Sequence, residues 1–524
     1  METIKVKRLV TFFYNPKNLI SYELCSISLT FIVLFWLLKF VWTRRNLYAS
    51  ARKLPGPCGL PIVGSAYKFL GDASDIYKGL DNLFSEYKNE VLFKAWFGTK
   101  LFYCTTDPKI FDTVLTSPNA LRKEPFYSLG DKLFGGGIFS QKSVPKWRRN
   151  RKLVTPAFNS QMLNSFTEVF VQHSDELIEL MKQYESKKDV DLNDLISRYA
   201  LKTICDTAMG INVDTESEGF NFNHWIDRAL EIVIERIFNI YYHSDVIFYN
   251  SALGKEFIEL CNKSRFFTRQ VIVKKRQQME EEKKNKALYY ESEELNRLTF
   301  IDILLKVTYE DDKSYFTDEE IVDETITLMV AGSDTTSTAS TFVLVLLGMH
   351  QDIQEKVLAE ILEVAGAERS MSANDLPELK YLERVIKETL RLFPVGPILA
   401  RTLDGDINVG HHVLSKGASI CLAVLRLHRS EKYWPNALKF DPDRFLPQNV
   451  AKIQPGSYVP FSHGPRNCFG LRYAMITMKV MLATILRRYK IFTDYKSIEE
   501  IDVKCSVVIR PINGYKLRYE SREY

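Results

Sequence analysis

The chain has 524 residues, of which 46% are hydrophobic and 26% are charged, and these ordinary globular values exclude a disordered chain and a membrane protein with many spans. The net charge of +5 is small for this length, and the basic residues do not interleave with aromatic residues, so we expect no nucleic-acid partner. The eight cysteines have no paired spacing, which argues against a disulfide framework and favours a reducing compartment. The length is compatible with about three domains or with one large helical domain.

An apolar stretch runs from Leu24 to Trp42 with Lys39 as its only charge. At ~1.5 Å per residue, a helix of this length nearly spans the ~30 Å hydrocarbon core of a bilayer, so we predict one membrane helix. A cleaved signal peptide fits less well, because residues 43–45, Thr-Arg-Arg, replace the small-residue cleavage site. A mitochondrial presequence is the other alternative, because four basic residues precede the stretch, namely Lys5, Lys7, Arg8 and Lys17. Four more follow it, so charge alone does not determine the orientation of the helix.

Residues 54–61, Leu-Pro-Gly-Pro-Cys-Gly-Leu-Pro, cannot continue a helix, because their three prolines lack an amide hydrogen. We therefore expect a hinge here, with a membrane anchor and its flanks over 1–53 and a catalytic domain over 54–524. An alternating pattern near Val91 to Tyr103 predicts a strand. Residues 160–316 are charged helical stretches in which we identify no catalytic motif.

A basic segment carries Trp147 and Arg151, which lie four residues apart and hence on one face of a helix. An indole N–H and a guanidinium on one face can both donate to the same carboxylate. This pattern is weak by itself, and a solvated basic helix is the alternative. Other basic residues surround the pair, namely Lys146, Arg148, Arg149 and Lys152.

A long helix is predicted to begin at a capping box formed by Thr317 and Glu320 and to continue to about Met349. Little charge follows Asp334, so this helix should cross the core. Its middle, residues 331–336, reads Ala-Gly-Ser-Asp-Thr-Thr, in which a mid-helix glycine costs ~1 kcal/mol relative to alanine. A segment that lowers helix stability in a buried helix suggests a functional role. The alternative is a structural role, in which a threonine hydroxyl bonds back to the preceding turn of a kinked helix.

Further along the chain, Glu388 and Arg391 lie three residues apart on one helix face, which by default indicates an ordinary surface ion pair. Arg444 follows in the segment 440–445, Phe-Asp-Pro-Asp-Arg-Phe. Between them, residues 394–399, Pro-Val-Gly-Pro-Ile-Leu, cannot be helical, and a short strand pattern begins at Ala400 and Arg401.

The run 461–470, Phe-Ser-His-Gly-Pro-Arg-Asn-Cys-Phe-Gly, leads into an apolar helical pattern from about Leu471 to Arg488. Its glycines allow tight turns and a close approach to a flat ligand, and the start of a helix favours a thiolate at Cys468. No second Cys or His stands at zinc-type spacing, so we interpret Cys468 as a single sulfur donor to a metal held by a macrocycle, namely haem. A structural cysteine and ligation by His463 are the alternatives.

This run resembles the Phe-x-x-Gly-x-Arg-x-Cys-x-Gly haem loop of the cytochrome P450 family at all five fixed positions, which are Phe461, Gly464, Arg466, Cys468 and Gly470. The other motifs follow in the order of that family, from the proline-rich hinge to this loop. The resemblance implies a mainly α fold with small β-sheets, in which a long central helix lies over the haem and one N-terminal transmembrane helix precedes the globule.

The resemblance also implies roles for single residues. Cys468 is the axial ligand, Gly332 leaves room for dioxygen, Thr335 donates to the distal oxygen, and Asp334 feeds protons through water. Haem contacts are implied for Trp147, Arg151 and Arg401 at the propionates and for Ala331, Gly332, Phe461, Gly464, Arg466 and Gly470 around the ring. A buried structural charge network is implied for Glu388, Arg391 and Arg444, and a substrate pocket for Val395, Ile398, Leu399 and Val507.

The function implied is that of a membrane-anchored haem-thiolate monooxygenase containing haem b. It would insert one atom of O2 into a lipophilic substrate, such as a fatty acid, hormone, terpenoid or xenobiotic. Electrons would come from NADPH through cytochrome P450 reductase, with cytochrome b5 as a further candidate partner, because the chain has no flavin fingerprint and no iron–sulfur cysteine cluster. The basic residues around Trp147, together with Arg472, are candidates for docking the acidic reductase, and solvated surface charge is the alternative. The implied location is the endoplasmic reticulum membrane, with a single span and a cytosolic catalytic domain.

Finer details resemble the insect branch of the clan that contains the fatty-acid ω-hydroxylases. Many members of that branch carry a Glu that can form an ester with the haem, where this chain has Ala331, and a His where it has Ser333. We therefore expect non-covalent haem, and terminal selectivity on fatty chains is not implied. Two alternatives to a monooxygenase are a haem-thiolate isomerase or dehydratase, which does not need Thr335, and a non-enzymatic haem-binding protein, which needs neither Asp334 nor Thr335.

Overall fold

The computed structural model describes residues 16–185, 191–213, 218–286, 298–309 and 315–523. The chain divides into two compact units, Met1–Leu54 and Pro55–Tyr524. The basic positions Lys5, Lys7 and Arg8 lie outside the described residues.

The first unit contains helix α2 (Pro16–Thr43) and the short helix α3 (Arg45–Arg52). Within α2, the 18 residues from Ser26 to Thr43 have a mean hydropathy of 1.8, and none of them is buried. This segment is long and apolar enough to cross a membrane, as the run from Leu24 to Trp42 predicted.

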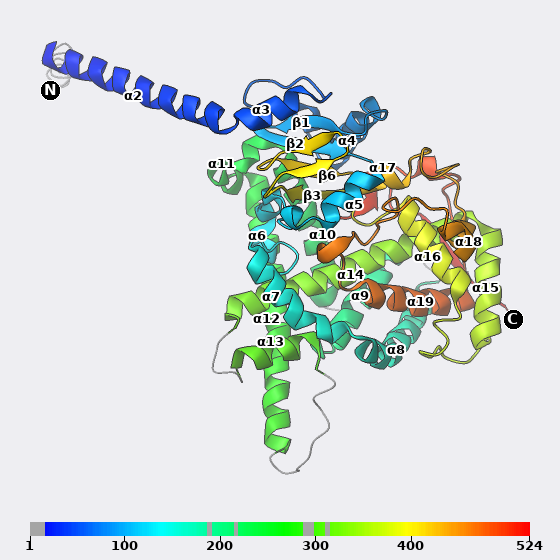
Figure 1. The fold of residues 1–524 in the computed structure, drawn as a ribbon. Coiled ribbons are helices and arrows are strands. Elements are labelled where there is room, and N and C mark those ends of the chain that lie inside the picture. The colour runs from blue at the N-terminus through cyan, green and yellow to red at the C-terminus, as the bar shows by residue number, and fades with distance from the viewer. Residues whose placement is uncertain (1–15, 186–190, 214–217, 287–297, 310–314, 524) are drawn as a thin grey trace, which may run out of the picture. The chain divides into compact units, whose positions relative to one another are not determined.

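The second unit is mostly helical, as the sequence predicted (Figure 1). Its helices are α4 (Ala73–Glu86), α5 (Pro108–Thr116), α6 (Asp131–Phe134), α7 (Val144–Val154), α8 (Ser160–Tyr184), α9 (Leu192–Met209), α10 (Glu218–Phe238), α11 (Asp245–Asn250), α12 (Ala252–Lys286), α13 (Phe300–Tyr309), α14 (Asp318–Met349), α15 (Gln351–Ala365), α16 (Lys380–Leu392), α17 (Val424–His428), α18 (Pro447–Val450) and α19 (Leu471–Arg488). Residues 54–61 are not helical, in agreement with the prolines.

The strands form four small sheets among the described residues. The largest has the order β1-β2-β6-β3, from β1 (Phe93–Phe97), β2 (Lys100–Thr105), β3 (Leu399–Thr402) and β6 (Ser419–Leu422). The single strand predicted near Val91 to Tyr103 is a hairpin in the structure, because β1 and β2 pair antiparallel across a turn at Gly98 and Thr99. The remaining strands form pairs, which are β4 (Ile407–Val409) with β5 (His412–Leu414), β7 (Tyr489–Thr493) with β10 (Leu517–Ser521), and β8 (Val503–Cys505) with β9 (Ile509–Pro511). The six described cysteines in this unit are all free.

The longest core element is α14, and its start follows from the predicted capping box. The Thr317 hydroxyl accepts from the Glu320 amide at 3.2 Å, and the Glu320 carboxylate accepts from the Thr317 amide at 2.9 Å. Both groups satisfy amides that the first turn leaves free. The helix then runs for 32 residues, of which 25 are buried.

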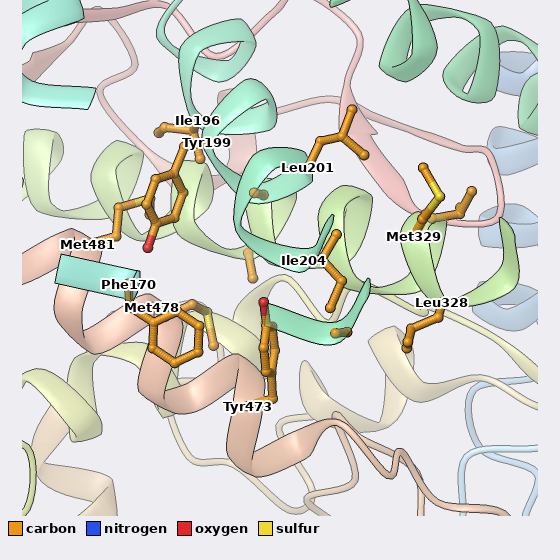
Figure 2. Packing of buried hydrophobic residues seen from close by; sticks show 14 of the residues in the cluster. Phe170, Ile196, Tyr199, Leu201, Ile204, Leu328, Met329, Tyr473, Met478 and Met481 are labelled. Carbon is orange, nitrogen blue, oxygen red and sulfur yellow. The ribbon is translucent and has the colours of Figure 1, made fainter. Parts of the chain in front are cut away.

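The core lies where α14 packs against α9 and α19, and α8 packs on α9 and α19. Figure 2 shows side chains from these helices packed together, with Ile204 of α9 beside Leu328 and Met329 of α14 and with Tyr473 and Met478 of α19 opposite. Burying these large apolar side chains is the main favourable term in the stability of the unit. The packing holds the middle of α14 close to the start of α19.

A buried charge network ties α16 to the segment after α17. Arg391 donates to both carboxylate oxygens of Glu388 at 2.7 and 2.8 Å, and neither side chain is exposed. The remaining Arg391 donors reach the carbonyl oxygens of residues 428, 437 and 439. Arg444 Nε lies 3.3 Å from Glu388 Oε1. The structure therefore brings together the three charges singled out in the sequence.

We expect Glu388→Gln to lower the free energy of unfolding by roughly 3 to 5 kcal/mol, because it leaves the Arg391 guanidinium buried without a counter-charge. Denaturant unfolding followed by circular dichroism measures this loss. The matched control is Lys380→Met on the same helix, which removes an exposed 2.8 Å pair with Glu378 and should cost at most about 1 kcal/mol. Equal losses in the two variants would contradict a special role for the buried network.

Candidate functional site

A cavity of 290 Å³ lies between the middle of α14 and the loop before α19. It collects most of the site residues predicted from the sequence, although these come from distant parts of the chain. The predicted residues that line it are Trp147, Arg151, Ala331, Gly332, Thr335, Val395, Leu399, Arg401, Phe461, Arg466, Cys468 and Gly470. The predicted residues that do not line it are Asp334, Ile398, Gly464 and Val507.

Cys468 presents its sulfur to this cavity from the loop that precedes α19. The Cys468 amide donates to the Phe461 carbonyl at 2.9 Å, which closes the loop, and Gly470 follows directly before α19. Burial raises the pKa of the Cys468 thiol, whereas the Gly470 amide and the charge of Arg151 lower it. A bound metal ion would supply the further positive charge that deprotonates such a thiol.

The alternative ligand, His463, lies outside the cavity. It is exposed and stands 3.5 Å from Asp112, as expected for a surface loop residue. No histidine lines the cavity, and the described residues contain no cluster of three or more His, Cys, Asp or Glu side chains that could hold a metal ion. A metal at Cys468 therefore needs ligands that the described protein residues do not supply, which fits a macrocycle.

The two glycines of the loop have different roles. Gly464 has a φ of +72°, and a side chain there would overlap the carbonyl oxygen of Leu115 at the end of α5. It therefore allows the loop to pack against α5, and it is not among the residues that line the cavity, where we expected it to approach the ligand. Gly470 lines the cavity, where a side chain would meet only the Cys468 sulfur at 3.9 Å.

Several cations face the cavity without a carboxylate among its lining residues. Arg401 is 1% exposed, and Arg466 has two nitrogens, Nε and Nη1, that lack a partner in the described part of the chain. Burial and then the neighbouring charges of Arg401 and Arg151 lower the pKa of Arg466 to about 9. Buried cations of this kind require an anionic partner. The two carboxylates of a haem would meet this requirement, so the residues present fit the group expected from the sequence.

Lys123 belongs to the same group of cations and was missed by the sequence analysis. It is 8% exposed, and burial followed by the charges of Arg401 and Arg466 holds its pKa well below the usual range. An isolated lysine in a loop has no motif around it. Its role became visible only when the fold placed it beside Arg401, with which it forms a β-bridge.

Trp147 and Arg151 lie on α7, as predicted, but their contacts differ from the expected pair of donors to one carboxylate. Arg151 donates to the carbonyl and the side-chain oxygen of Asn467 at 2.7 and 2.6 Å, which ties α7 to the loop of Cys468. Arg466 stacks over the Trp147 ring at 4.2 Å. We had expected Arg151 to donate to a carboxylate in the cavity. In the structure, it is Arg466 whose Nε and Nη1 donors are without a partner among the described residues.

The middle of α14 opens to the cavity at Ala331 and Thr335, one helical turn apart. The Thr335 hydroxyl donates to the Ala331 carbonyl at 2.6 Å, which is the back-bonding that the sequence left as an alternative. Gly332 also lines the cavity, and a side chain there would come within 2.6 Å of Ile204. The glycine therefore also serves the close approach of α9 to α14, which Figure 2 shows at Ile204.

Asp334 does not line the cavity, which differs from the role expected for it. Its Oδ1 accepts from Arg510 of β9, and the same guanidinium nitrogen also binds Asp227 of α10. Asp334 is 6% exposed, and its Oδ2 has no partner among the described residues. Burial raises the pKa of Asp227. The acid of the motif thus joins three elements through one shared arginine.

A second cavity of 170 Å³ contains the other two predicted pocket residues, Ile398 and Val507. Its lining is rich in aromatic side chains, which the sequence analysis did not identify because they come from separate strands, loops and helices. They are Phe69, Phe84, Phe97, Phe102, Phe126, Tyr127, Phe134, Phe139 and Phe238. Glu124 is the one charged residue in this lining, and it is paired with Lys100.

The sequence is similar to known proteins over nearly its whole length. A family model described as Cytochrome P450 matches residues 54–519. Cytochrome P450 4g15 of Drosophila melanogaster is 30% identical, over 94% of this chain and 96% of that protein. Cytochrome P450 4c21 of Blattella germanica is 31% identical over 95% and 99%. Cytochrome P450 4V2 of Homo sapiens is 31% identical over 88% of each chain.

Proposed function

The chain belongs to the cytochrome P450 family, whose members are haem monooxygenases, and we propose that it is a membrane-anchored member that oxidises lipophilic molecules with electrons from a separate reductase. The observation that carries this proposal is the sulfur of Cys468 in a cavity whose buried cations lack counter-ions. A thiolate-held haem with two carboxylates meets both requirements.

Cys468 would hold the iron, and Arg401, Arg466 and Lys123 would hold the carboxylates of haem b. When bound, the haem supplies the activation of O2, because a thiolate ligand pushes electron density toward the iron and favours cleavage of the O–O bond. Trp147 would pack beside the same carboxylates. Attachment would be non-covalent, because Ala331 has no carboxylate with which to form an ester.

Thr335 is the proposed proton donor on the side of the cavity opposite Cys468. Its hydroxyl donates to the Ala331 carbonyl in the structure, and a rotation about the Cβ–Oγ1 bond would direct the hydrogen into the cavity. Asp334 is the proposed source of protons, although Arg510 holds its Oδ1. Its unpartnered Oδ2 is the oxygen that could bind a water molecule leading toward Thr335.

The substrate is proposed to be lipophilic and to arrive from a membrane. The second cavity is almost entirely apolar, and α2 contains a segment suited to crossing a bilayer. In the second unit, Leu60, Ile62, Val246 and Ile247 are 55%, 82%, 74% and 51% exposed, which is unusual for large apolar side chains. We assign residues 1–53 as the anchor with its flanks, 54–524 as the catalytic domain and the endoplasmic reticulum as the location, with the catalytic domain in the cytosol.

The proposed electron donor is NADPH–cytochrome P450 reductase, with cytochrome b5 as a further candidate. Arg148 and Lys152 of α7 are exposed and would attract an acidic partner. The neighbouring cations are partly engaged, since Lys146 pairs with Glu320 and Arg149 stacks over Phe316 at 5.4 Å. Arg472 donates to the Ser160 hydroxyl at 3.0 Å.

Cys468→Ser should abolish the shift of the Soret band that carbon monoxide produces in a reduced haem-thiolate protein, because an alcohol oxygen replaces the sulfur. Difference spectra of the reduced protein measure this shift. Cys58→Ser, which changes an exposed cysteine, is the matched control and should leave the spectrum unchanged. A shift that persists in Cys468→Ser would point to another ligand.

Thr335→Ala should lower the amount of product formed per NADPH by roughly tenfold or more, because the proton donor to bound oxygen is lost. Product and NADPH are measured together with added reductase and a substrate found by spectral screening of fatty acids, terpenoids and insecticide-like molecules. Ser340→Ala on the same helix removes an equivalent 2.8 Å back-bond away from the cavity and should keep the coupling. An unchanged ratio in Thr335→Ala would contradict its role as proton donor, and product formed without NADPH would favour an isomerase.

Acidified organic solvent should extract the haem freely from the wild-type protein, because Ala331 cannot form the ester. Ala331→Glu supplies the missing carboxylate and is the matched variant, which should retain part of its haem after turnover. Absorbance of the solvent and protein phases measures the partition. Haem that stays on the wild-type chain would show a covalent link elsewhere.

A further inference from the structure

Phe139 lies at the boundary between the two cavities and belongs to the lining of both. Its ring packs edge to face on Tyr127 at 5.6 Å and lies 6.0 Å from Phe134, and the ammonium of Lys123 lies 4.3 Å from its centre. Two aromatic rings and the ammonium of Lys123 therefore contact the side chain that lies between the two cavities.

The loop that carries Phe139 is pressed against α14 by three consecutive glycines. Gly135 has a φ of +52°, and a side chain at this position would overlap the carboxylate of Asp323. A side chain at Gly137 would overlap the hydroxyl of Thr327. The run of glycines is thus explained by the contact of this loop with α14.

Two adjacent carboxylates on α14 hold the backbone of this loop. The Gly136 amide donates to Asp323 Oδ2 at 2.8 Å, and the Ile138 amide donates to Glu324 Oε2 at 2.8 Å. The second oxygen of Glu324 accepts from Asn150 of α7 at 2.7 Å. The bond to Ile138 is made one residue before Phe139, so the position of Glu324 limits where the Phe139 ring can lie.

The two carboxylates differ in their charge partners. Asp323 is paired with Arg265 at 2.8 Å, whereas no cation of the described chain lies within ion-pair distance of Glu324, which is 1% exposed. Burial raises the pKa of Glu324 to about 7, although its two hydrogen-bond donors oppose this change. An unpaired buried carboxylate is costly for stability, and such costs are concentrated at functional positions.

We propose that Glu324 is a positioning residue that holds Phe139 as a partition between the two cavities, and that this partition limits the length of the apolar molecule accepted beside Thr335. The inference rests on the proposed function, because it takes the first cavity as the haem site. A molecule too long for the space on the Thr335 side would have to displace Phe139 to enter the aromatic cavity.

The test uses the haem-loaded full chain and a series of 1-alkylimidazoles from butyl to tetradecyl, whose imidazole binds haem iron and shifts its absorption. In the wild type, affinity should rise about fourfold per added methylene while the chain is being buried, and should then level off where it meets Phe139. In Phe139→Ala, the rise should continue, so that the longest probes bind roughly tenfold or more tightly than to the wild type.

In Glu324→Gln, affinity should keep rising to longer chains than in the wild type, as in Phe139→Ala. The glutamine amide has only one acceptor oxygen, so its NH2 group would face the N–H donor of either Ile138 or Asn150. Glu320→Gln, one turn earlier on α14 and not bonded to the loop, should keep the wild-type length limit. Asn150→Ala, which removes the other donor to Glu324, provides a second variant and should move the limit in the same direction as Glu324→Gln.

A purely structural role of Glu324 would lower haem content or thermal stability without changing the length at which affinity levels off. An unchanged limit in Phe139→Ala would overturn the partition, and an unchanged limit in Glu324→Gln and Asn150→Ala would overturn the role of Glu324. Either result leaves the proposed function intact if butylimidazole still shifts the wild-type spectrum. Absence of that shift would instead remove the proposed function, and the inference with it.

Discussion

The burial of positive charge around the Cys468 cavity is the constraint on which the rest of the site depends. Arg401, Arg466 and Lys123 are held in a low-dielectric space whose lining contains no carboxylate. The contrast with Arg391 is informative, since its guanidinium is equally buried but is satisfied by Glu388 and by backbone carbonyls. The protein thus neutralises Arg391 itself, whereas the described lining of the cavity supplies no carboxylate for Arg401, Arg466 and Lys123. If an anionic cofactor binds these cations, its binding would also stabilise the fold.

Helix α14 organises the site because one continuous element presents different chemistry on its different sides. Glu324 holds the glycine loop, and Ala331 and Thr335, seven and eleven residues later, face the cavity. Asp334 is rotated by about 100° from Thr335 and meets Arg510 instead. The capping box at one end of this long helix and its packing against α9 and α19 hold all of these groups at fixed positions relative to one another.

Local interactions were predictable because they depend on residues close in sequence. The capping box at Thr317, the helix from Leu471 to Arg488 and the non-helical prolines after residue 54 all appear as predicted. The resemblance to the family was recognised from the same kind of local pattern around Cys468, and the match over residues 54–519 confirms it. The orientation of Asp334 was not predictable, because it is decided by Arg510, which lies 176 residues further along the chain.

The sequence by itself determined which residue types stand at fixed short spacings, and through them the family, the sulfur donor and the long central helix. Only the tertiary structure decided which of these groups share a space. In the structure, Gly464 and Asp334 do not line the cavity, and Arg151 donates to Asn467. The cavity lining also includes Lys123 and Phe139, which belong to no sequence motif. The physical reason is that hydrogen bonds within one turn or loop form between residues that are close in sequence. Burial and charge pairing depend instead on contacts between distant segments, which form only when the chain packs.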